Sequence, residues 1–318
     1  MPGPRRVLVT CPPMRHSIHR YGELFEKHNF QVDAPDIVQT MSEQELIEVL
    51  PAYDGWVIGD DPATANVFRH GVEGRLRGAV KWGVGVDNVD FHGAEAAGLQ
   101  VTNTPGMFGR EVADVAYSYL VGLARGLFEI DAGVKDNRWP KPVGISLCDK
   151  TCALVGMGDI GFEIAKRLLV CDMKVNVYDP AKPDLSSLAG TIRHLDWPEA
   201  IDESDFVVLC CSLNENTRNL IGGEFFRQCK NGLRLVNVSR GPLVDEMALA
   251  DAIESGVVHS AALEVFDTEP LPADSPLRRF PQLIFGSHNG SNTQEAVDRT
   301  SHTAVEKLAN QLDRKSAT

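Results

Sequence analysis

The sequence predicts an α/β protein with two parallel sheets, each covered by helices. Three observations support this prediction. The 318 residues suffice for about two domains. Short apolar runs of strand length alternate with amphipathic segments of helix length along nearly the whole chain. Apolar residues make up 43% of the chain and charged residues 24%, as in ordinary globular proteins with well-filled cores.

Four apolar runs in the first third of the chain have the length and composition of buried strands. They lie at residues 7–10, 56–58, 79–82 and 99–102. A helix is expected between the first two, at residues 43–50, with Leu46, Ile47 and Leu50 on one face. This order of elements favours parallel strands with helical crossovers.

A longer helix is predicted after Pro105 and Gly106, because apolar residues recur there at spacings of three and four. These residues are Val112, Val115, Ala116, Tyr119, Leu120 and Leu123. Regular structure is expected to stop before Pro140 and Pro142, since proline cannot continue a helix.

A second alternating series starts at Thr151. Its strands are expected at residues 152–155, 174–178, 206–211, 233–238, 258–263 and 283–285. The last helix is expected from about Thr293 to Leu312, after three residues that cap helices well, Ser291, Asn292 and Thr293.

The net charge and the segment composition exclude several classes of partner. The formal charge of −13 argues against nucleic acid, which requires a basic surface. The N-terminal segment lacks the apolar core of a signal peptide. The longest apolar stretch, residues 117–130, contains Arg125 and Glu129 and is too short to span a bilayer. We therefore expect a cytoplasmic protein without a membrane partner.

The seven cysteines predict neither disulfides nor a metal site. Their number is odd and no CxxC occurs, so reduced and buried thiols are expected. His16 and His19 follow Cys11, but this spacing is poor for a metal site.

A glycine-rich turn follows the strand predicted at residues 152–155. Gly156, Gly158 and Gly161 form GxGxxG, and a predicted helix begins directly after it. These glycines allow a tight turn, close approach of a pyrophosphate and close helix packing, while the helix N-terminus faces the phosphates. Asp179 ends the next strand, where it can bind a ribose diol and repel a 2′-phosphate. The motif predicts a Rossmann domain that binds NAD rather than NADP; the alternative is a glycine turn without a ligand.

Three polar residues follow strands of the second series, where ligands bind in open parallel sheets. Arg240, Glu269 and His288 could therefore converge beside the nicotinamide. An arginine can hold the carboxylate of a 2-oxo acid and polarise its carbonyl. A histidine paired with a carboxylate can deliver the proton near neutral pH. The competing interpretation is a solvated histidine and a surface ion pair.

The chain resembles the D-isomer-specific 2-hydroxyacid dehydrogenases over nearly its whole length, most of all their short phosphoglycerate-dehydrogenase-type members. The resemblance rests on GVGVDNVD at residues 83–90, TNTPG at 102–106, the glycine turn, NVSRGPLVDE at 237–246, LEVFDTEP at 263–270 and SHNG at 287–290.

The resemblance implies Arg240, Glu269 and His288 as the catalytic set. It implies that the backbone of Val84, Gly85 and Val86 holds the substrate carboxylate. The residues expected at the cofactor are Gly156, Met157, Gly158, Asp159, Ile160, Gly161, Asp179, Cys211, Ser212, Thr217, Ser239, Glu264 and Gly290.

The resemblance also implies the organisation of the chain. Residues 1–102 and 291–318 would form a flavodoxin-like substrate domain, and residues 103–290 the NAD-binding Rossmann domain, with a cleft between them. The protein would be a homodimer, with the helix at residues 107–126 and the region of Trp139 in the interface.

Several positions depart from the family pattern. Glu264 stands where the family usually has the aspartate that holds the nicotinamide carboxamide, and Ser212 and Ser287 replace prolines. No regulatory domain is expected after Thr318.

Three cations are candidates for binding a substrate phosphate. Arg110 either binds that phosphate or pairs with Glu111 or Asp114. Lys81 and Lys141 are weaker candidates and are expected to be solvated.

The leading hypothesis is an NAD-dependent oxidoreductase that interconverts a D-2-hydroxy acid and its 2-oxo acid. 3-Phosphoglycerate and 3-phosphohydroxypyruvate are one candidate pair. A glyoxylate or hydroxypyruvate reductase is the alternative among enzymes. A non-catalytic NAD(H)-binding sensor is the alternative from another class, although a sensor has no need of Arg240, Glu269 and His288 together.

Overall fold

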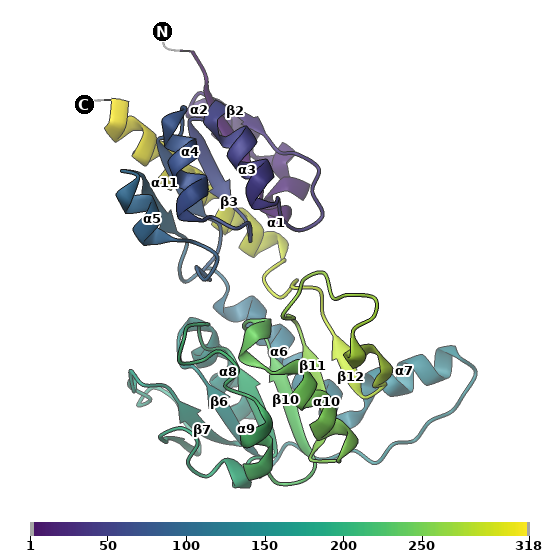
Figure 1. Cartoon of the computed structure of the whole chain (residues 1–318). Coiled ribbons are helices and arrows are strands. Elements are labelled where there is room, and N and C mark those ends of the chain that lie inside the picture. The colour runs from purple at the N-terminus through teal and green to yellow at the C-terminus, as the bar shows by residue number, and fades with distance from the viewer. Residues whose placement is uncertain (1–2, 317–318) are drawn as a thin grey trace. The chain divides into compact units, whose positions relative to one another are not determined.

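The computed structural model describes residues 3–316, which form two compact units (Figure 1). The first unit comprises Met1–Phe108 and Asn292–Thr318, and the second comprises Gly109–Ser291. The boundary after Phe108 lies six residues beyond the one expected after residue 102, and the boundary after Ser291 lies one residue beyond the one expected after residue 290. Each unit contains one sheet in which all strand pairs are parallel, so the predicted α/β class is confirmed.

The first unit contains a five-stranded sheet with the order β2-β1-β3-β4-β5. Its strands are β1 (Arg5–Val9), β2 (Phe30–Asp33), β3 (Gly55–Ile58), β4 (Gly78–Lys81) and β5 (Gln100–Asn103). Its helices are α1 (Pro12–His16), α2 (Gly22–Lys27), α3 (Glu43–Val49), α4 (Ala65–Glu73), α5 (Phe91–Ala96) and α11 (Gln294–Ser316), with 3₁₀ turns η1 (Ile18–Tyr21) and η2 (Leu50–Ala52).

Local sequence explains several elements of this unit. Ser42 and Glu45 form a capping box that starts α3, and the Thr64 hydroxyl accepts the Val67 N–H at the start of α4. Strands β3 and β4 are fully buried, which fits their continuous apolar runs. The sequence analysis missed β2, an edge strand whose exposed Gln31 interrupts the apolar pattern.

Helix α11 completes the first unit, although its sequence follows the whole second unit. It packs on β3 and β4, where Leu308 lies directly over Gly55 and the Gln311 amide donates to the Ala79 carbonyl at 3.3 Å. The Thr293 hydroxyl accepts the Ala296 N–H, as expected for a cap. The helix extends past the predicted end at Leu312.

The second unit contains a seven-stranded sheet with the order β12-β11-β10-β9-β6-β7-β8. Its strands are β6 (Thr151–Val155), β7 (Lys174–Tyr178), β8 (Ile192–His194), β9 (Phe206–Leu209), β10 (Leu233–Asn237), β11 (Val258–Leu263) and β12 (Leu283–Phe285). The strand order reverses at β6, which creates the switch point where doubly wound sheets bind ligands. Three-residue β8, at the sheet edge, was not predicted.

Helices and 3₁₀ turns connect the strands of this sheet (Figure 1). The helices are α6 (Gly109–Arg125), α7 (Leu127–Lys135), α8 (Asp159–Val170), α9 (Gly223–Gln228) and α10 (Glu246–Glu254), with turns η3 (Ile201–Glu203), η4 (Gly241–Leu243) and η5 (Pro276–Arg279). Gly126 separates α6 from α7 with a φ of 63°, in the left-handed region that favours glycine.

The structure bears on the expected burial of the cysteines and on the search for a membrane-spanning helix. All seven cysteines are unpaired, but Cys148 is exposed, so the expectation of uniformly buried thiols is wrong there. No helix within residues 3–316 is long and apolar enough to cross a bilayer.

Candidate active site

The glycine turn joins β6 to α8 with little room for side chains. Gly156 has a φ of 99°, and a Cβ there would lie 2.6 Å from the Cys211 nitrogen. A Cβ on Gly161 would collide with the Gly156 carbonyl. By contrast, a Cβ on Gly158 would meet nothing within 4 Å, so the surface over the turn is open. The turn therefore has the shape that a dinucleotide pyrophosphate requires.

Asp179 and the N-terminus of α8 complete this region. The Asp179 carboxylate accepts the Met157 N–H at 2.7 Å and the Ala181 N–H at 2.8 Å. The first internal bond of α8 runs from the Phe162 N–H to the Gly158 carbonyl at 2.9 Å. The N–H groups of the first turn thus point out of the helix end, where they favour an anion.

The segment after β9 is tied to the segment after β10. The Ser239 hydroxyl donates to the Cys211 carbonyl, and the Thr217 hydroxyl donates to the Ser212 carbonyl at 2.8 Å. The segments after β9 and β10, which carry these four residues, are thus linked beside the glycine turn.

Arg240 leaves the sheet at the carboxyl end of β10. Its Nη1 donates to the Ser239 carbonyl at 2.7 Å, and the Asn237 amide donates to the Arg240 carbonyl at 2.8 Å. Gly241 lies so close to the Phe266 carbonyl that no side chain would fit between them. Backbone and side-chain contacts therefore fix the direction in which Arg240 leaves the strand.

His288 and Glu269 form a direct pair. The His288 Nδ1 lies 2.7 Å from Glu269 Oε2, and Glu269 Oε1 accepts the Phe266 N–H at 3.0 Å. The side chains of His288 and Glu269 are 24% and 21% exposed, so the pair is shielded but reachable. Glu269 follows β11 and His288 follows β12, and Arg240 follows the adjacent β10. The predicted set thus lies after three neighbouring strands.

Glu264 follows β11 directly and is 4% exposed. Its carboxylate accepts two hydrogen bonds, from the Tyr119 hydroxyl and from the Asn289 N–H. Gly290, also predicted at the cofactor, is buried, with its Cα facing Val112 and Glu264. Sequence analysis did not identify Tyr119 as a partner, because it lies 145 residues away.

In the first unit, the segment after β4 forms an open loop. Val84 is 44% exposed, and its carbonyl accepts the Asn103 amide at 3.2 Å. Within residues 3–316, the N–H groups of Val84, Gly85 and Val86 have no hydrogen-bond acceptor. Three such donors in succession suit an anion.

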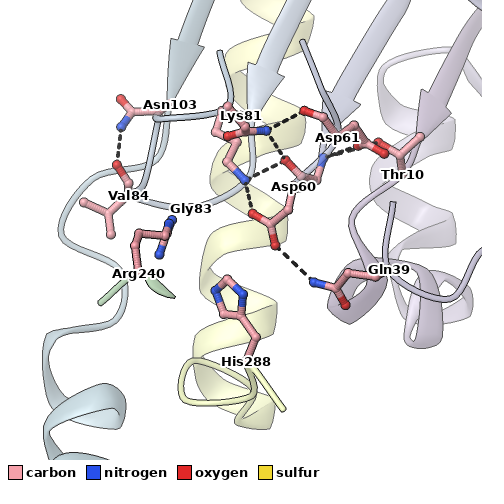
Figure 2. Close-up of polar contacts among 12 residues, drawn as sticks. Thr10, Gln39, Asp60, Asp61, Lys81, Gly83, Val84, Asn103, Arg240 and His288 are labelled. Atoms are coloured by element: carbon pink, nitrogen blue, oxygen red, sulfur yellow. Dashed lines mark hydrogen bonds and ion pairs between the residues drawn. The ribbon is translucent and has the colours of Figure 1, made fainter. Parts of the chain in front are cut away.

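A buried polar network lies beside this loop (Figure 2). Asp61 has no exposed surface and accepts the Thr10 hydroxyl and the N–H groups of Gly59 and Met41. Burial raises the pKa of the Asp61 carboxyl. The sequence analysis missed this network, because its members come from separate strands and no local pattern links them.

Lys81 belongs to the same network. It is 3% exposed, and its Nζ donates to the Gly59 carbonyl at 2.6 Å and to Asp60 Oδ1 at 2.8 Å. The expectation that Lys81 is solvated is therefore wrong. Asp60 also accepts the Gln39 amide at 3.3 Å, which fixes its carboxylate over Lys81 (Figure 2).

The other two candidate cations are on the surface of the second unit. Arg110 is exposed, and Asp114, one of its expected partners, pairs instead with Arg167 at 2.6 Å. Lys141 is exposed in the irregular segment after α7, as expected.

Comparison with known proteins assigns the family. Residues 117–290 match the model of the NAD-binding domain of D-isomer specific 2-hydroxyacid dehydrogenases. The chain belongs to this family. It is 34% identical over 278 residues to a hydroxypyruvate reductase of Thermotoga maritima, a match that covers 86% of this chain and 89% of that protein.

Two further relatives of this dehydrogenase support the assignment. A D-3-phosphoglycerate dehydrogenase of Archaeoglobus fulgidus is 31% identical over 308 residues, which cover 96% of this chain but only 57% of that protein. The crystal structure of the TT0316 protein from Thermus thermophilus is 31% identical, with a TM-score of 0.84 and 97% of each chain covered. The dehydrogenase is an NAD-dependent oxidoreductase of D-2-hydroxy acids, which confirms the predicted family, enzyme class and cofactor.

Proposed function

We propose that Arg240, Glu269 and His288 carry the interconversion of a short 2-hydroxy acid and its 2-oxo acid. The observation that supports this proposal most directly is the 2.7 Å contact between His288 Nδ1 and Glu269 Oε2. It orients the ring so that Nε2 is the nitrogen that exchanges a proton with substrate. Glu269 stabilises the imidazolium that donates this proton to the forming hydroxyl.

Arg240 binds the substrate carboxylate and polarises its carbonyl. A guanidinium presents a planar fork of donors, which suits the adjacent carboxylate and carbonyl oxygens of a 2-oxo acid. In the first unit, the N–H groups of Val84, Gly85 and Val86 are donors that suit a carboxylate. When bound, NADH supplies the hydride.

The second unit holds the cofactor. The glycine turn, with Met157, Asp159 and Ile160, binds the pyrophosphate, and Asp179 binds the adenosine ribose. Cys211, Ser212, Thr217 and Ser239 line the path between the phosphates and the nicotinamide, and Gly290 leaves room beside the ring. The open face over Gly158 and the linked strand ends support this proposal.

The first unit binds the substrate, and its buried polar network indicates the substrate class. A phosphate carries nearly two negative charges and needs unneutralised cations. Lys81 is neutralised by Asp60 at 2.8 Å, and Asp61 lies next to this pair. The network therefore offers no unneutralised cation to a phosphate, which favours an unphosphorylated 2-oxo acid of the hydroxypyruvate or glyoxylate kind. Exposed Arg110 is the cation that would support 3-phosphohydroxypyruvate instead.

The dehydrogenase works as a homodimer in the cytoplasm. Apolar side chains are exposed on α7 and the segment after it, among them Leu127, Phe128, Trp139 and Val143. Trp139 and Val143 are 73% and 95% exposed, and a second copy of the chain would cover them. The seven unpaired cysteines fit a reducing compartment.

The experiment that tests this function is NADH oxidation against a panel of 2-oxo acids. The panel contains hydroxypyruvate, glyoxylate, pyruvate and 3-phosphohydroxypyruvate, and NADH binding is titrated in parallel. We expect kcat/KM to be more than tenfold higher for an unphosphorylated member. Preference for 3-phosphohydroxypyruvate would overturn the substrate class and leave the reaction intact. Tight NADH binding without turnover would favour the sensor hypothesis.

A further inference from the structure

The loop that carries His288 is anchored to Glu264 by its own backbone. The His288 N–H donates to the Glu264 carbonyl at 2.8 Å, and the Asn289 N–H donates to the Glu264 carboxylate. Just before them, the Gly286 N–H donates to the Leu263 carbonyl at 2.8 Å. Three backbone N–H groups of residues 286–289 are thus hydrogen-bonded to Leu263 and Glu264, at the end of β11.

This anchoring holds His288 in a costly conformation. Its φ is 54°, in the left-handed region that residues other than glycine rarely adopt. Such a conformation persists only where surrounding contacts impose it. Two hydrogen bonds to Glu264 flank the Cα of His288. One comes from the His288 N–H and the other from the Asn289 N–H.

Tyr119 of α6 fixes the other oxygen of the Glu264 carboxylate. Its hydroxyl donates to Oε2, while Asn289 occupies Oε1. Burial and the neighbouring carboxylate raise the pKa of Tyr119 well above its usual value, so the hydroxyl stays a donor. A Cβ on Gly286 would lie 2.6 Å from the Tyr119 oxygen, so the loop packs directly against this bond.

We propose that Tyr119 and Glu264 are positioning residues that hold His288 against Glu269. In this protein the Glu264 carboxylate serves the histidine loop and not the nicotinamide carboxamide. The extra methylene of glutamate, compared with the usual aspartate, gives the reach from the end of β11 to both Asn289 and Tyr119. This inference rests on the proposed role of His288 as the acid.

We call the hydrogen bonds from Tyr119 and Asn289 to the Glu264 carboxylate the clamp. The test compares Tyr119→Phe with Glu264→Gln, since each removes part of the clamp at nearly constant side-chain volume. We measure the NADH Kd, kcat with the best 2-oxo acid, and the pH dependence of kcat. We expect Tyr119→Phe to lower kcat about tenfold with the NADH Kd unchanged within about twofold. The pH at which kcat falls to half should move downward, because a displaced His288 lies farther from Glu269, which then stabilises the imidazolium less.

Glu264→Gln should have the larger effect, because an amide has one acceptor oxygen for two donors. Tyr117→Phe, on the same helix, is the matched control; its hydroxyl contacts Cys171 and should leave kcat unchanged. A variant that raises the NADH Kd more than about fivefold with kcat retained would overturn the inference and return Glu264 to the cofactor. Unchanged kcat and pH profile in Tyr119→Phe would overturn it too.

A readout without turnover separates this inference from the proposed function. The ring resonances of His288, assigned by their loss in His288→Asn, are followed by NMR against pH in the unliganded protein. If no 2-oxo acid is reduced, the proposed function fails, whereas a downward shift of the His288 titration midpoint in Tyr119→Phe still supports the clamp. An unshifted midpoint would contradict it.

Discussion

The two sheets of this dehydrogenase both carry charged side chains after the carboxyl ends of their strands, but they use them differently. In the first unit, Asp61 is fully buried and Lys81 is 3% exposed, and their donors and acceptors are satisfied by the unit itself. In the second unit, the side chains of His288 and Glu269 keep 24% and 21% exposure. The residues proposed to carry the reaction thus keep part of their surface exposed, whereas the buried charged residues of the first unit are satisfied within it.

The largest effect is expected from removing Arg240, which is partly exposed. Arg240→Ala should lower kcat/KM by a factor of about 10³ or more. The variant lacks the guanidinium proposed to bind the substrate carboxylate and to polarise the substrate carbonyl. Steady-state kinetics with the best 2-oxo acid measures the loss. Arg240→Lys keeps the positive charge but lacks the planar guanidinium, so its kcat/KM should lie between those of the unmodified enzyme and Arg240→Ala. A loss under tenfold in a folded Arg240→Ala protein would refute the role of this residue.

A second prediction concerns the edge of the buried network. Asp60→Asn removes the charge that neutralises Lys81, so a phosphate should be tolerated better. The ratio of kcat/KM for 3-phosphohydroxypyruvate to that for hydroxypyruvate should rise about tenfold, which is about 1.4 kcal/mol. Glu73→Gln, which changes an exposed acid on α4, is the control for net charge. An unchanged ratio would show that Lys81 does not face the substrate.

The smallest expected effect is on stability. In Asp61→Asn, the amide oxygen can replace Oδ2 for the Thr10 hydroxyl and the Gly59 N–H, but the amide NH₂ then faces the Met41 N–H, which loses its acceptor. We expect the free energy of unfolding to fall by about 2 kcal/mol, measured by urea denaturation. If Asp61 is purely structural, kcat for hydroxypyruvate should stay within about twofold. A large loss of kcat at unchanged stability would place Asp61 among the chemical groups.

Local patterns were sufficient to predict most of this fold. The strands expected at residues 174–178, 258–263 and 283–285 match β7, β11 and β12, since each is a compact apolar run. The expected strand at 206–211 was too long, because apolar Cys210 and Cys211 continue the run after β9 leaves the sheet at Leu209. Edge strands β2 and β8 were missed because exposed residues break their apolar patterns.

The candidate site was predictable where a residue lies in the short segment after a strand, as Arg240 does after β10 and His288 after β12. Parallel strands bring such residues to one edge whatever their separation in sequence. The partners of Lys81 and Glu264 were not predictable, because they depend on contacts across the fold. Asp60 lies 21 residues from Lys81 and Tyr119 lies 145 residues from Glu264, and no periodicity links either pair.

The discontinuity of the first unit has a consequence for biosynthesis. Strands β1 to β5 are translated first, but the helix that covers β3 and β4, α11, is translated only after the whole second unit. The second unit is continuous and can fold while the ribosome is still working. During that interval the apolar face around Gly55, later covered by Leu308, stays open on the nascent chain. The part of the enzyme that is made first is therefore the part whose apolar surface is covered last.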